Sequence, residues 1–136
     1  MSAFFFVLLL LAQPARPPLR ERAVKGDADA QFTLGKNYEA GRGGLKKDYA
    51  EAASWYLKSA EQGNAYAEAS LGILYRAGKG VPRDEVQAEM WFLISAERCA
   101  EGDRDTILEM RDSVAAHLTP RQLAEARRLA HEWKPK

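Results

Sequence analysis

Residues 26–43 read GDADAQFTLGKNYEAGRG, and residues 63–80 read GNAYAEASLGILYRAGKG. The two stretches are identical at nine of eighteen positions when the second is placed 37 residues after the first. Self-similarity at a period of about 20 to 50 residues is typical of proteins built from stacked structural units. The sequence therefore predicts a repeat protein in which each unit buries its apolar face against its neighbours.

A second match follows each stretch at a spacing of 36 residues. The corresponding pairs are Asp48/Asp84, Ala52/Ala88, Trp55/Trp91, Tyr56/Phe92 and Ala60/Ala96. Apolar side chains recur at three- and four-residue steps in both halves of a unit, which is the spacing of an α-helix. Each unit is thus predicted to be two helices. The loop between Gly43 and Asp48 is expected to absorb the residue by which the two spacings differ.

Helix start and stop signals stand at matching places in the two units. Asp and Asn side chains cap helix N-termini by accepting hydrogen bonds from free backbone N–H groups, and glycine ends helices by adopting the left-handed conformation. The expected caps are Asp27, Asp48, Asn64 and Asp84, and the expected stops are Gly41, Gly63, Gly78 and Gly102. First helices should end near Ala40 and Ala77, and second helices near Gln62 and Ala100.

The apolar residues of the two units are expected to form the core. The side chains predicted to be largely buried are Leu34, Tyr38, Trp55, Leu71, Tyr75 and Trp91. A glycine inside a helix costs about 1 kcal/mol relative to alanine, so Gly35 and Gly72 indicate a close approach between helices. We expect each tryptophan to lie among alanines and to face the glycine of its unit. Large aromatic side chains usually enter the core, which favours packing over ligand stacking for both tryptophans.

The flanking sequences read as degenerate copies that close the stack. Residues 19–25 match the tail of a second helix. Residues 104–118 predict a further helix, in which Met110-Arg111 takes the place of the Leu-Gly pair of the two complete units. Thr119 as cap and Pro120 in the first turn start the last helix. The expected repeat domain covers residues 19–136 with about six helices. Its parts are units at about 26–62 and 63–101 and capping helices at 103–118 and 119–133.

Residues 1–15 stand apart because they contain no charged side chain, and a Pro-rich linker at 16–18 follows them. Residues 3–12 form an unbroken apolar run, which as a helix would rise roughly 15 Å. That is too short for a stable membrane span, and it matches the apolar region of a secretory signal peptide. Ala12 or Ala15 would be the last residue removed. We therefore expect a periplasmic or secreted protein, and a cytoplasmic one if the leader is not a signal.

The composition argues against several classes of function. Lys+Arg number 20 and Asp+Glu 19, for a net charge of +1, whereas nucleic-acid binders show a basic excess. Cys99, His117 and His131 are too few for a structural zinc site, which takes four ligands. No set of nucleophile and base is evident, and the glycine-rich loops lack the spacing of a phosphate-binding loop. We expect no catalysis, cofactor, metal, nucleic acid or small-molecule substrate.

The C-terminal segment carries a basic cluster interleaved with acids. Its cations are Arg127, Arg128, His131, Lys134 and Lys136, and the acids between them include Glu125 and Glu132. Such a mixed run favours a solvated helix face, and contact with an anionic surface is the alternative.

The repeated pattern resembles the Sel-1-like repeat, a helix–turn–helix relative of the tetratricopeptide repeat. The matching residues of the first unit are Gly26, Ala28, Ala30, Leu34, Gly35, Tyr38, Gly41, Gly43, Asp48, Ala52, Trp55, Tyr56, Ala60 and Gly63. The resemblance covers residues 19–100, and residues 119–133 are similar to the closing helix of bacterial members. It implies an all-α fold, a short right-handed α-solenoid, and a role in scaffolding protein complexes, in many bacterial cases after export. One exported subgroup, linked with weak β-lactam hydrolysis, has a disulfide in every repeat, and the single Cys99 sets this chain apart from it.

Two roles are compatible with these features. The leading one is a non-catalytic adaptor that binds a protein or peptide in the solenoid groove. The alternative is a structural accessory subunit packed permanently into a larger envelope assembly, and a weak hydrolase is a distant third. Helical geometry at about 100° per residue places the groove opposite Leu34 and Leu71. The residues expected to line it are Phe32, Lys36, Glu39, Tyr66, Ile73 and Arg76. The two cations among them suit a peptide that contains an acidic residue.

Overall fold

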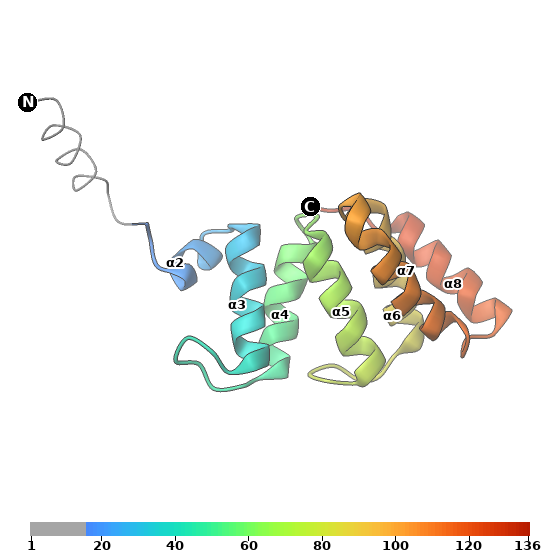
Figure 1. Cartoon of the computed structure of the whole chain (residues 1–136), viewed down its shortest axis with the longest axis horizontal. Coiled ribbons are helices and arrows are strands. Elements are labelled where there is room, and N and C mark those ends of the chain that lie inside the picture. Colours follow the sequence, from blue (N-terminus) through green and yellow to red (C-terminus); the bar gives the residue numbers. More distant parts are fainter. Residues whose placement is uncertain (1–15) are drawn as a thin grey trace, which may run out of the picture.

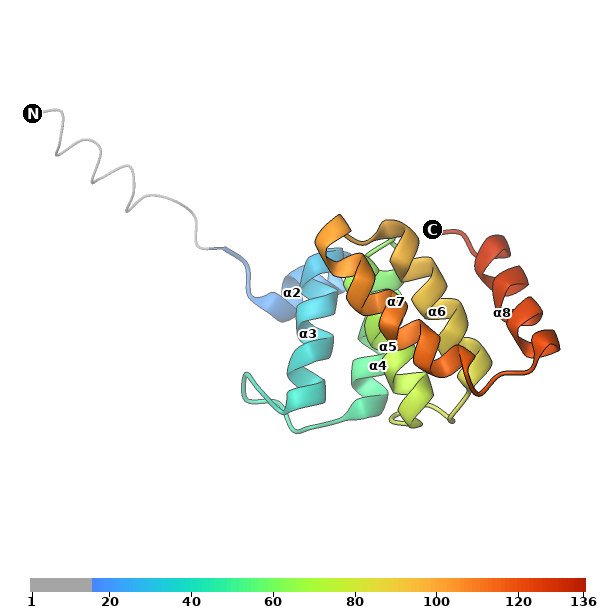
Figure 2. The same ribbon diagram turned by 45° about the vertical axis from the view of Figure 1, so that its right-hand side comes forward.

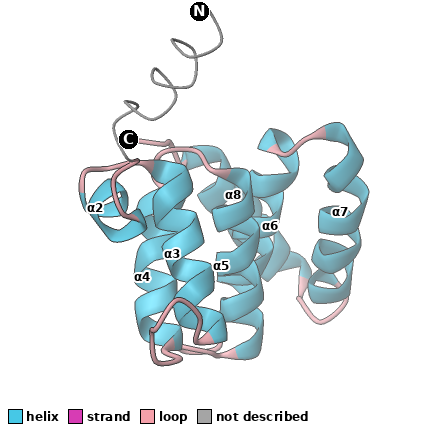
Figure 3. Ribbon diagram, turned by 60° about the vertical axis from the view of Figure 1, so that its left-hand side comes forward, coloured by secondary structure: helices cyan, strands magenta, loops and turns pink. Residues whose placement is uncertain are grey.

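The computed structural model describes residues 16–136, which form seven α-helices and no strand (Figure 3). The helices are α2 (Leu19–Val24), α3 (Ala28–Ala40), α4 (Tyr49–Ala60), α5 (Ala65–Ala77), α6 (Glu85–Arg98), α7 (Glu101–Ala115) and α8 (Pro120–Glu132). The all-α prediction is confirmed. The short α2 is the helical tail expected before the first unit, and the other six are the helices of the units and caps. The expected leader, residues 1–15, lies outside the described residues.

The helices follow one another along the long axis of the molecule, from α2 at one end to α8 at the other (Figure 1). Helix α3 packs against α4, and α5 packs against α6, so the two helices of each predicted unit are spatial neighbours. Helix α5 also packs against α4 and thereby joins the two units. A stack of this kind buries apolar surface between neighbouring pairs rather than around one central point.

The expected caps form at the starts of α3, α4, α5 and α6. A side-chain oxygen of the capping residue accepts a hydrogen bond from the backbone N–H three residues later, at 3.0 Å in each case. Gly41 and Gly78 end α3 and α5 in the left-handed conformation, both with a φ of 66°. Helices α3 and α5 are each 13 residues long. The one-residue difference between the units therefore lies in the loop after α3.

Inside each unit, an aromatic ring of the second helix lies against a glycine of the first. A Cβ atom added to Gly35 would lie 2.7 Å from Tyr56 Cδ1, and one added to Gly72 would lie 2.7 Å from Phe92 Cε1. Carbon atoms pack best at about 3.5 to 4.0 Å, so neither position has room for a larger residue. The close approach predicted from these glycines is confirmed, and it places an aromatic ring of the second helix against the backbone of the first.

The prediction that Trp55 and Trp91 face these glycines is wrong. Each tryptophan precedes the contacting ring by one residue, which turns it about 100° around the helix axis. Trp55 packs in a cluster with Ala23, Ala30 and Leu34, at the junction with α2. Trp91 belongs to the largest core cluster and contacts Trp133.

Hydrogen bonds fix both ends of each helix pair. At one end, Ser59 Oγ donates to the Ala28 carbonyl and Ser95 Oγ donates to the Ala65 carbonyl, both at 2.7 Å. At the other end, the backbone N–H groups of Asp48 and Asp84 donate to the carbonyls of Tyr38 and Tyr75 at 2.9 and 3.0 Å. The two units therefore repeat their polar contacts as well as their apolar ones.

Four of the six predicted core residues are buried, namely Leu34, Trp55, Leu71 and Trp91. The other two, Tyr38 and Tyr75, are only half-buried. They lie near the last turns of α3 and α5, where a phenol reaches the surface, and the Tyr38 hydroxyl accepts a hydrogen bond from Arg20 Nη1 at 3.0 Å. In the described part of the chain, the aromatic side chains that are fully buried are Tyr56 and Phe92.

The junction between α6 and α7 departs from the prediction. Helix α6 ends at Arg98, Cys99 is extended with a ψ of 160°, and α7 begins at Glu101. Gly102 therefore lies in the first turn of α7 and does not stop α6. The extended conformation of Cys99 ends the helix without a glycine.

The predicted alignment of Met110-Arg111 with the Leu-Gly pair is wrong as well. Counting from the helix starts, the seventh residue of α5 is Leu71 and the seventh of α7 is Ile107, and both are buried. Leu108 then stands where Gly72 stands in α5. The third unit thus lacks the glycine that accepts an aromatic ring.

Helix α8 begins as predicted but packs in an unexpected place. Thr119 accepts a hydrogen bond from the Gln122 backbone N–H, the Gln122 side chain accepts one from the Thr119 N–H, and Pro120 lies in the first turn. Helices α7 and α8 lie on opposite sides of α6 (Figure 2). They barely touch each other, so the expected terminal pair is not a helix pair of the α3–α4 kind.

We predict that Gly72→Ala lowers the free energy of unfolding by up to about 2 kcal/mol. The new methyl group must displace the Phe92 ring, which costs up to about 3 kcal/mol, and the gain of about 1 kcal/mol in helix propensity offsets part of that cost. Gly102→Ala is the matched control, since it is also a helical glycine but a Cβ there has nothing within 4 Å. Urea unfolding measures both variants, and equal losses in the two would contradict the contact.

Candidate protein-binding face

One side of the described molecule is formed by α3, α5 and α7, the first helices of successive units. We call it the first-helix face. It contains a hollow of about 240 Å³ with a largely apolar lining. The hollow is lined by Phe32 of α3, by Tyr66, Ala69, Ser70 and Ile73 of α5, and by Asp103, Thr106, Ile107 and Met110 of α7. Three helices that are distant in sequence thus share one recess.

Aromatic contacts fix one wall of the hollow. The Phe32 ring centroid lies 5.7 Å from that of Tyr56 and 6.0 Å from that of Tyr66, with tilted planes in both cases. Such offset aromatic pairs are favourable beyond their buried area. Because Tyr56 also contacts Gly35, the exposed wall is a continuation of the buried contact inside the first unit.

Polar groups at the rim orient these rings. Tyr66 Oη donates a hydrogen bond to Asp103 Oδ2 at 2.9 Å, and this bond raises the pKa of the Tyr66 phenol. The Lys36 ammonium lies 5.6 Å from the Phe32 ring centroid. The hollow therefore has an apolar floor with an anion on one side and a cation on the other, which is a favourable arrangement for anchoring a side chain of a partner.

Two of the exposed large apolar residues belong to this hollow. Among residues 16–136, the residues of this type are Val24, Leu57, Tyr66 and Ile73. Tyr66 is 51% exposed and Ile73 is 43% exposed. Single exposed apolar residues are ordinary, and here two of them lie in the same recess.

The structure brings some of the predicted groove residues together and separates others. Phe32, Tyr66 and Ile73 line the hollow, and Lys36 borders it through Phe32. Glu39 lies elsewhere, since it is half-buried and accepts a hydrogen bond from Tyr56 Oη at 2.5 Å. Arg76 is exposed and does not line the hollow. The predicted set is thus an apolar cluster with one adjacent cation.

The contribution of α7 is absent from the sequence prediction. Asp103, Thr106, Ile107 and Met110 supply one whole side of the hollow. The sequence prediction assigns the groove only to the first helices of the two complete units. The signal that could have found this side is the three- and four-residue spacing of Asp103, Thr106, Ile107 and Met110, which places them on one face of α7.

Other reactive side chains are dispersed. Cys99 is buried, with its Sγ 3.6 Å from the Ala96 carbonyl oxygen. His117 contacts the Ser113 carbonyl at 3.0 Å, whereas His131 lies on α8. Among residues 16–136, no three His, Cys, Asp or Glu side chains are grouped to hold a metal ion. In the same part of the chain, none of the helices combines the length and the apolarity needed to cross a membrane.

Comparison with known proteins identifies the repeats. The Sel1 repeat family matches residues 28–64 and 65–98. The chain is 36% identical over 62 residues to the ERAD-associated E3 ubiquitin-protein ligase component HRD3A of Arabidopsis thaliana. It is also 36% identical over 73 residues to the chitin synthase regulator SKT5 of Saccharomyces cerevisiae. These matches cover 46% and 53% of this chain, but only 9% and 10% of the relatives.

Solved structures share the architecture over most of the chain. The protective antigen c5321 of uropathogenic Escherichia coli, which displays an SLR fold, superposes with a TM-score of 0.75 and 40% identity. The match covers 84% of this chain and 24% of that one. A Sel1 repeat protein from Oxalobacter formigenes gives a TM-score of 0.61 at 25% identity, over 92% of this chain and 48% of the other.

One buried carboxyl group distinguishes the second unit from the first. Glu68 is 0% exposed, and its Oε1 lies 3.3 Å from Arg98 Nε. Burial raises the pKa of Glu68 to about 7, although the charge of Arg98 opposes the shift. The matching residue of the first unit is the neutral Gln31, whose amide donates to the Ala23 carbonyl at 3.0 Å and accepts from Gln62 at 2.8 Å.

We predict that Glu68 makes the stability of the fold fall as pH rises. A carboxyl whose folded pKa exceeds its unfolded value favours the protonated native state, so its contribution is complete at low pH and is lost as pH rises toward 7. Between pH 4 and pH 8, the free energy of unfolding of Glu68→Gln should therefore rise by about 3 kcal/mol relative to that of the wild type. Chemical unfolding at several pH values measures this difference.

The reciprocal variant provides the control. Gln31→Glu places a carboxyl at the matching buried position and should acquire the same loss of stability with rising pH, since burial there also disfavours the charged form. Parallel stability profiles for the wild type and Glu68→Gln would contradict the assignment.

Proposed function

Because the chain belongs to the Sel1 repeat family, whose members mediate protein–protein interactions, we propose that it is a non-catalytic adaptor that binds a protein or peptide on its first-helix face. The single observation that carries this proposal is the hollow shared by α3, α5 and α7. Its exposed apolar groups sit on rigid helices and are flanked by Lys36 and Asp103. A partner segment that inserts an apolar side chain there would cover Tyr66 and Ile73.

The comparisons support a role exerted through other proteins. One relative is named as a component of a ubiquitin-protein ligase and another as a regulator of chitin synthase. This chain spans about a tenth of each relative, so we do not assign the activities of those whole proteins to it. The dispersed cysteine and histidines give no support to a catalytic alternative.

The shape of the hollow favours a peptide-like partner over a small molecule. Pockets for small ligands usually enclose about 300 to 1,000 Å³, whereas this recess measures about 240 Å³. A partner that lies across α3, α5 and α7 with one anchoring side chain needs no deep enclosure, since a few buried aromatic and apolar contacts dominate most interfaces.

We also propose export to the periplasm or the cell exterior. The support is the uncharged apolar run at residues 3–12, which has the length of a signal-peptide core.

We predict that Ile73→Asp weakens partner binding at least about tenfold, because a carboxylate in the apolar hollow would have to be desolvated in the complex. Leu57→Asp on α4 is the matched control, since Leu57 is 42% exposed and Ile73 is 43% exposed. Quantitative affinity purification from cells that naturally produce the protein, followed by titration of the recovered partner, measures both variants.

Circular dichroism first establishes that both variants keep the helical content of the wild type. Partner binding that survives Ile73→Asp but not Leu57→Asp would place the interface on the opposite side of the stack. A wild-type protein that remains soluble only inside a large permanent assembly would favour the accessory-subunit alternative.

The export proposal predicts a shortened native protein. Intact-mass measurement should give a chain that begins after Ala12 or Ala15, because signal peptides are removed on export. Fractionation of the same cells should place that species outside the cytoplasm. A full-length mass in the cytoplasmic fraction would contradict the proposal.

A further inference from the structure

In the structure, some basic residues of the C-terminal cluster form ion pairs with carboxylates and others do not. Arg128 is neutralised by its own helix, with contacts of 2.6 Å to Glu125 and 2.7 Å to Glu132. Lys136 pairs with Glu61 at 3.1 Å, where the C-terminal tail returns to the end of α4 (Figure 1). Within the described residues, Arg127, His131 and Lys134 make no ion pair.

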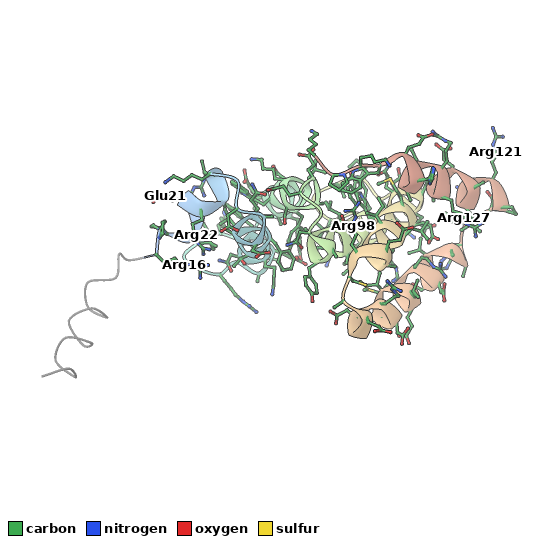
Figure 4. All side chains as sticks on the ribbon, turned by 90° about the horizontal axis from the view of Figure 1, so that it is seen from above. Arg16, Glu21, Arg22, Arg98, Arg121 and Arg127 are labelled. Carbon is green, nitrogen blue, oxygen red and sulfur yellow. The ribbon has the colours of Figure 1, made fainter. Side chains whose placement is uncertain are left out.

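Arg127, His131 and Lys134 share one face of α8 and its C-terminal end, because they are spaced four and three residues apart. They line a cleft of about 540 Å³ between α8 and α6, more than twice the volume of the hollow on the first-helix face. Figure 4 shows Arg98 and Arg127 on this side of the molecule, on neighbouring helices, whereas Arg121 lies at the far tip of α8.

Contacts with the core hold Arg98 at the end of α6 and Trp133 at the end of α8 in place. Arg98 lies with its guanidinium 5.1 Å from the Trp133 ring centroid, and its Nε is 3.3 Å from Glu68. Trp133 in turn meets Trp91 edge to face, at a centroid distance of 5.4 Å. Arg98 and Trp133 are therefore fixed by the core, and a ligand would find them already oriented.

The cleft combines excess positive charge with apolar surface. The carboxylate in its lining is Glu97, whereas among residues 16–136 Arg127 and Lys134 make no ion pair and Arg98 pairs with Glu68 behind the wall of the cleft. Apolar contact surface comes from Leu93, Ile94, Ala130 and Trp133. Carboxylates form strong charge-assisted hydrogen bonds with arginine, and the apolar part matches the aliphatic or aromatic side chains that accompany carboxylates in a peptide.

We propose that the cleft between α6 and α8 binds an acidic segment of a partner protein, with carboxylates at Arg127 and Lys134 and an apolar side chain against Trp133. A flat anionic membrane is a poorer match, because the cations lie in a recess with an apolar lining. A nucleic acid is a poorer match as well, because the net charge of +1 gives little long-range attraction for a polyanion. This site lies on different helices from the hollow and does not depend on the proposed function there.

The test uses a short fluorescein-labelled peptide in which glutamate alternates with leucine, and measures its binding to the full chain by fluorescence anisotropy. We expect saturable binding, and loss of about tenfold or more in affinity when glutamine replaces every glutamate in the peptide. The same loss is expected for the double variant Arg127→Gln/Lys134→Gln. Arg121→Gln is the matched control for the single variant Arg127→Gln, because each removes one cation from α8 and Arg121 lies outside the cleft, and Arg121→Gln should bind within about twofold of the wild type.

Glutamine is chosen in place of an acidic residue because Glu89 is buried nearby. Burial raises the pKa of Glu89 and the charge of Arg127 lowers it, so a new carboxylate at position 127 would threaten the fold. Circular dichroism and thermal unfolding check each variant, and His131→Gln provides a milder single substitution if the double variant unfolds.

Three outcomes would overturn the proposal. One is equal affinity for the glutamate and glutamine peptides. Another is equal weakening by Arg121→Gln and by the cleft variants, which would indicate attraction by overall charge. The third is binding to phosphatidylserine vesicles with no binding to the acidic peptide, which would assign the cations to a membrane. Ile73→Asp leaves the cleft intact and should not change binding of this peptide, so the result is independent of the first-helix face.

Discussion

The contact between a helical glycine and an aromatic ring sets the geometry of both complete repeats. Gly35 faces Tyr56 and Gly72 faces Phe92, and in each case a Cβ would come within 2.7 Å of the ring. A glycine weakens its own helix by about 1 kcal/mol, and the buried ring offsets this cost. The contact fixes how closely the two helices of a unit approach, and the serine and loop hydrogen bonds then fix their ends.

The third unit shows what happens when this contact is missing. Leu108 is the eighth residue of α7, the place that Gly35 and Gly72 hold in α3 and α5. Its side chain packs against the cluster of α6 and α7 residues that includes Phe92 and Ile107, and α8 packs on the far side of α6. That displacement leaves α7 free to complete the hollow with α3 and α5, and it creates the cleft between α6 and α8.

The sequence predicts the parts of this structure that local chemistry determines. Caps at Asp27, Asn64 and Thr119 follow from side-chain oxygens next to free N–H groups, and the left-handed Gly41 and Gly78 follow from the absence of a Cβ. The contacts between residues of two helices are not determined locally, because they depend on the rotation of both helices about their axes. The assignment of the tryptophans to the glycines fails for this reason, by one residue. The α7 side of the hollow is not predicted because it depends on how α7 packs beside α5, and the pattern of the two complete repeats does not describe that packing.

In the last helix of the stack, a charged group stands at the position that an aromatic ring holds in the complete units. Arg127 is the eighth residue of α8, as Tyr56 is of α4 and Phe92 is of α6. In the complete units that position enters the core against a glycine. In α8 it carries a guanidinium, which is costly to bury without a partner, and facing it in the repeat pattern is Leu108 in place of glycine. The substitution that ends the repeat therefore also turns a core position into a binding position, with Arg127 exposed on the cleft wall. A terminal unit needs a polar outer surface to stop the stack from continuing, and here the residue that provides it is also the one that gives the cleft its charge.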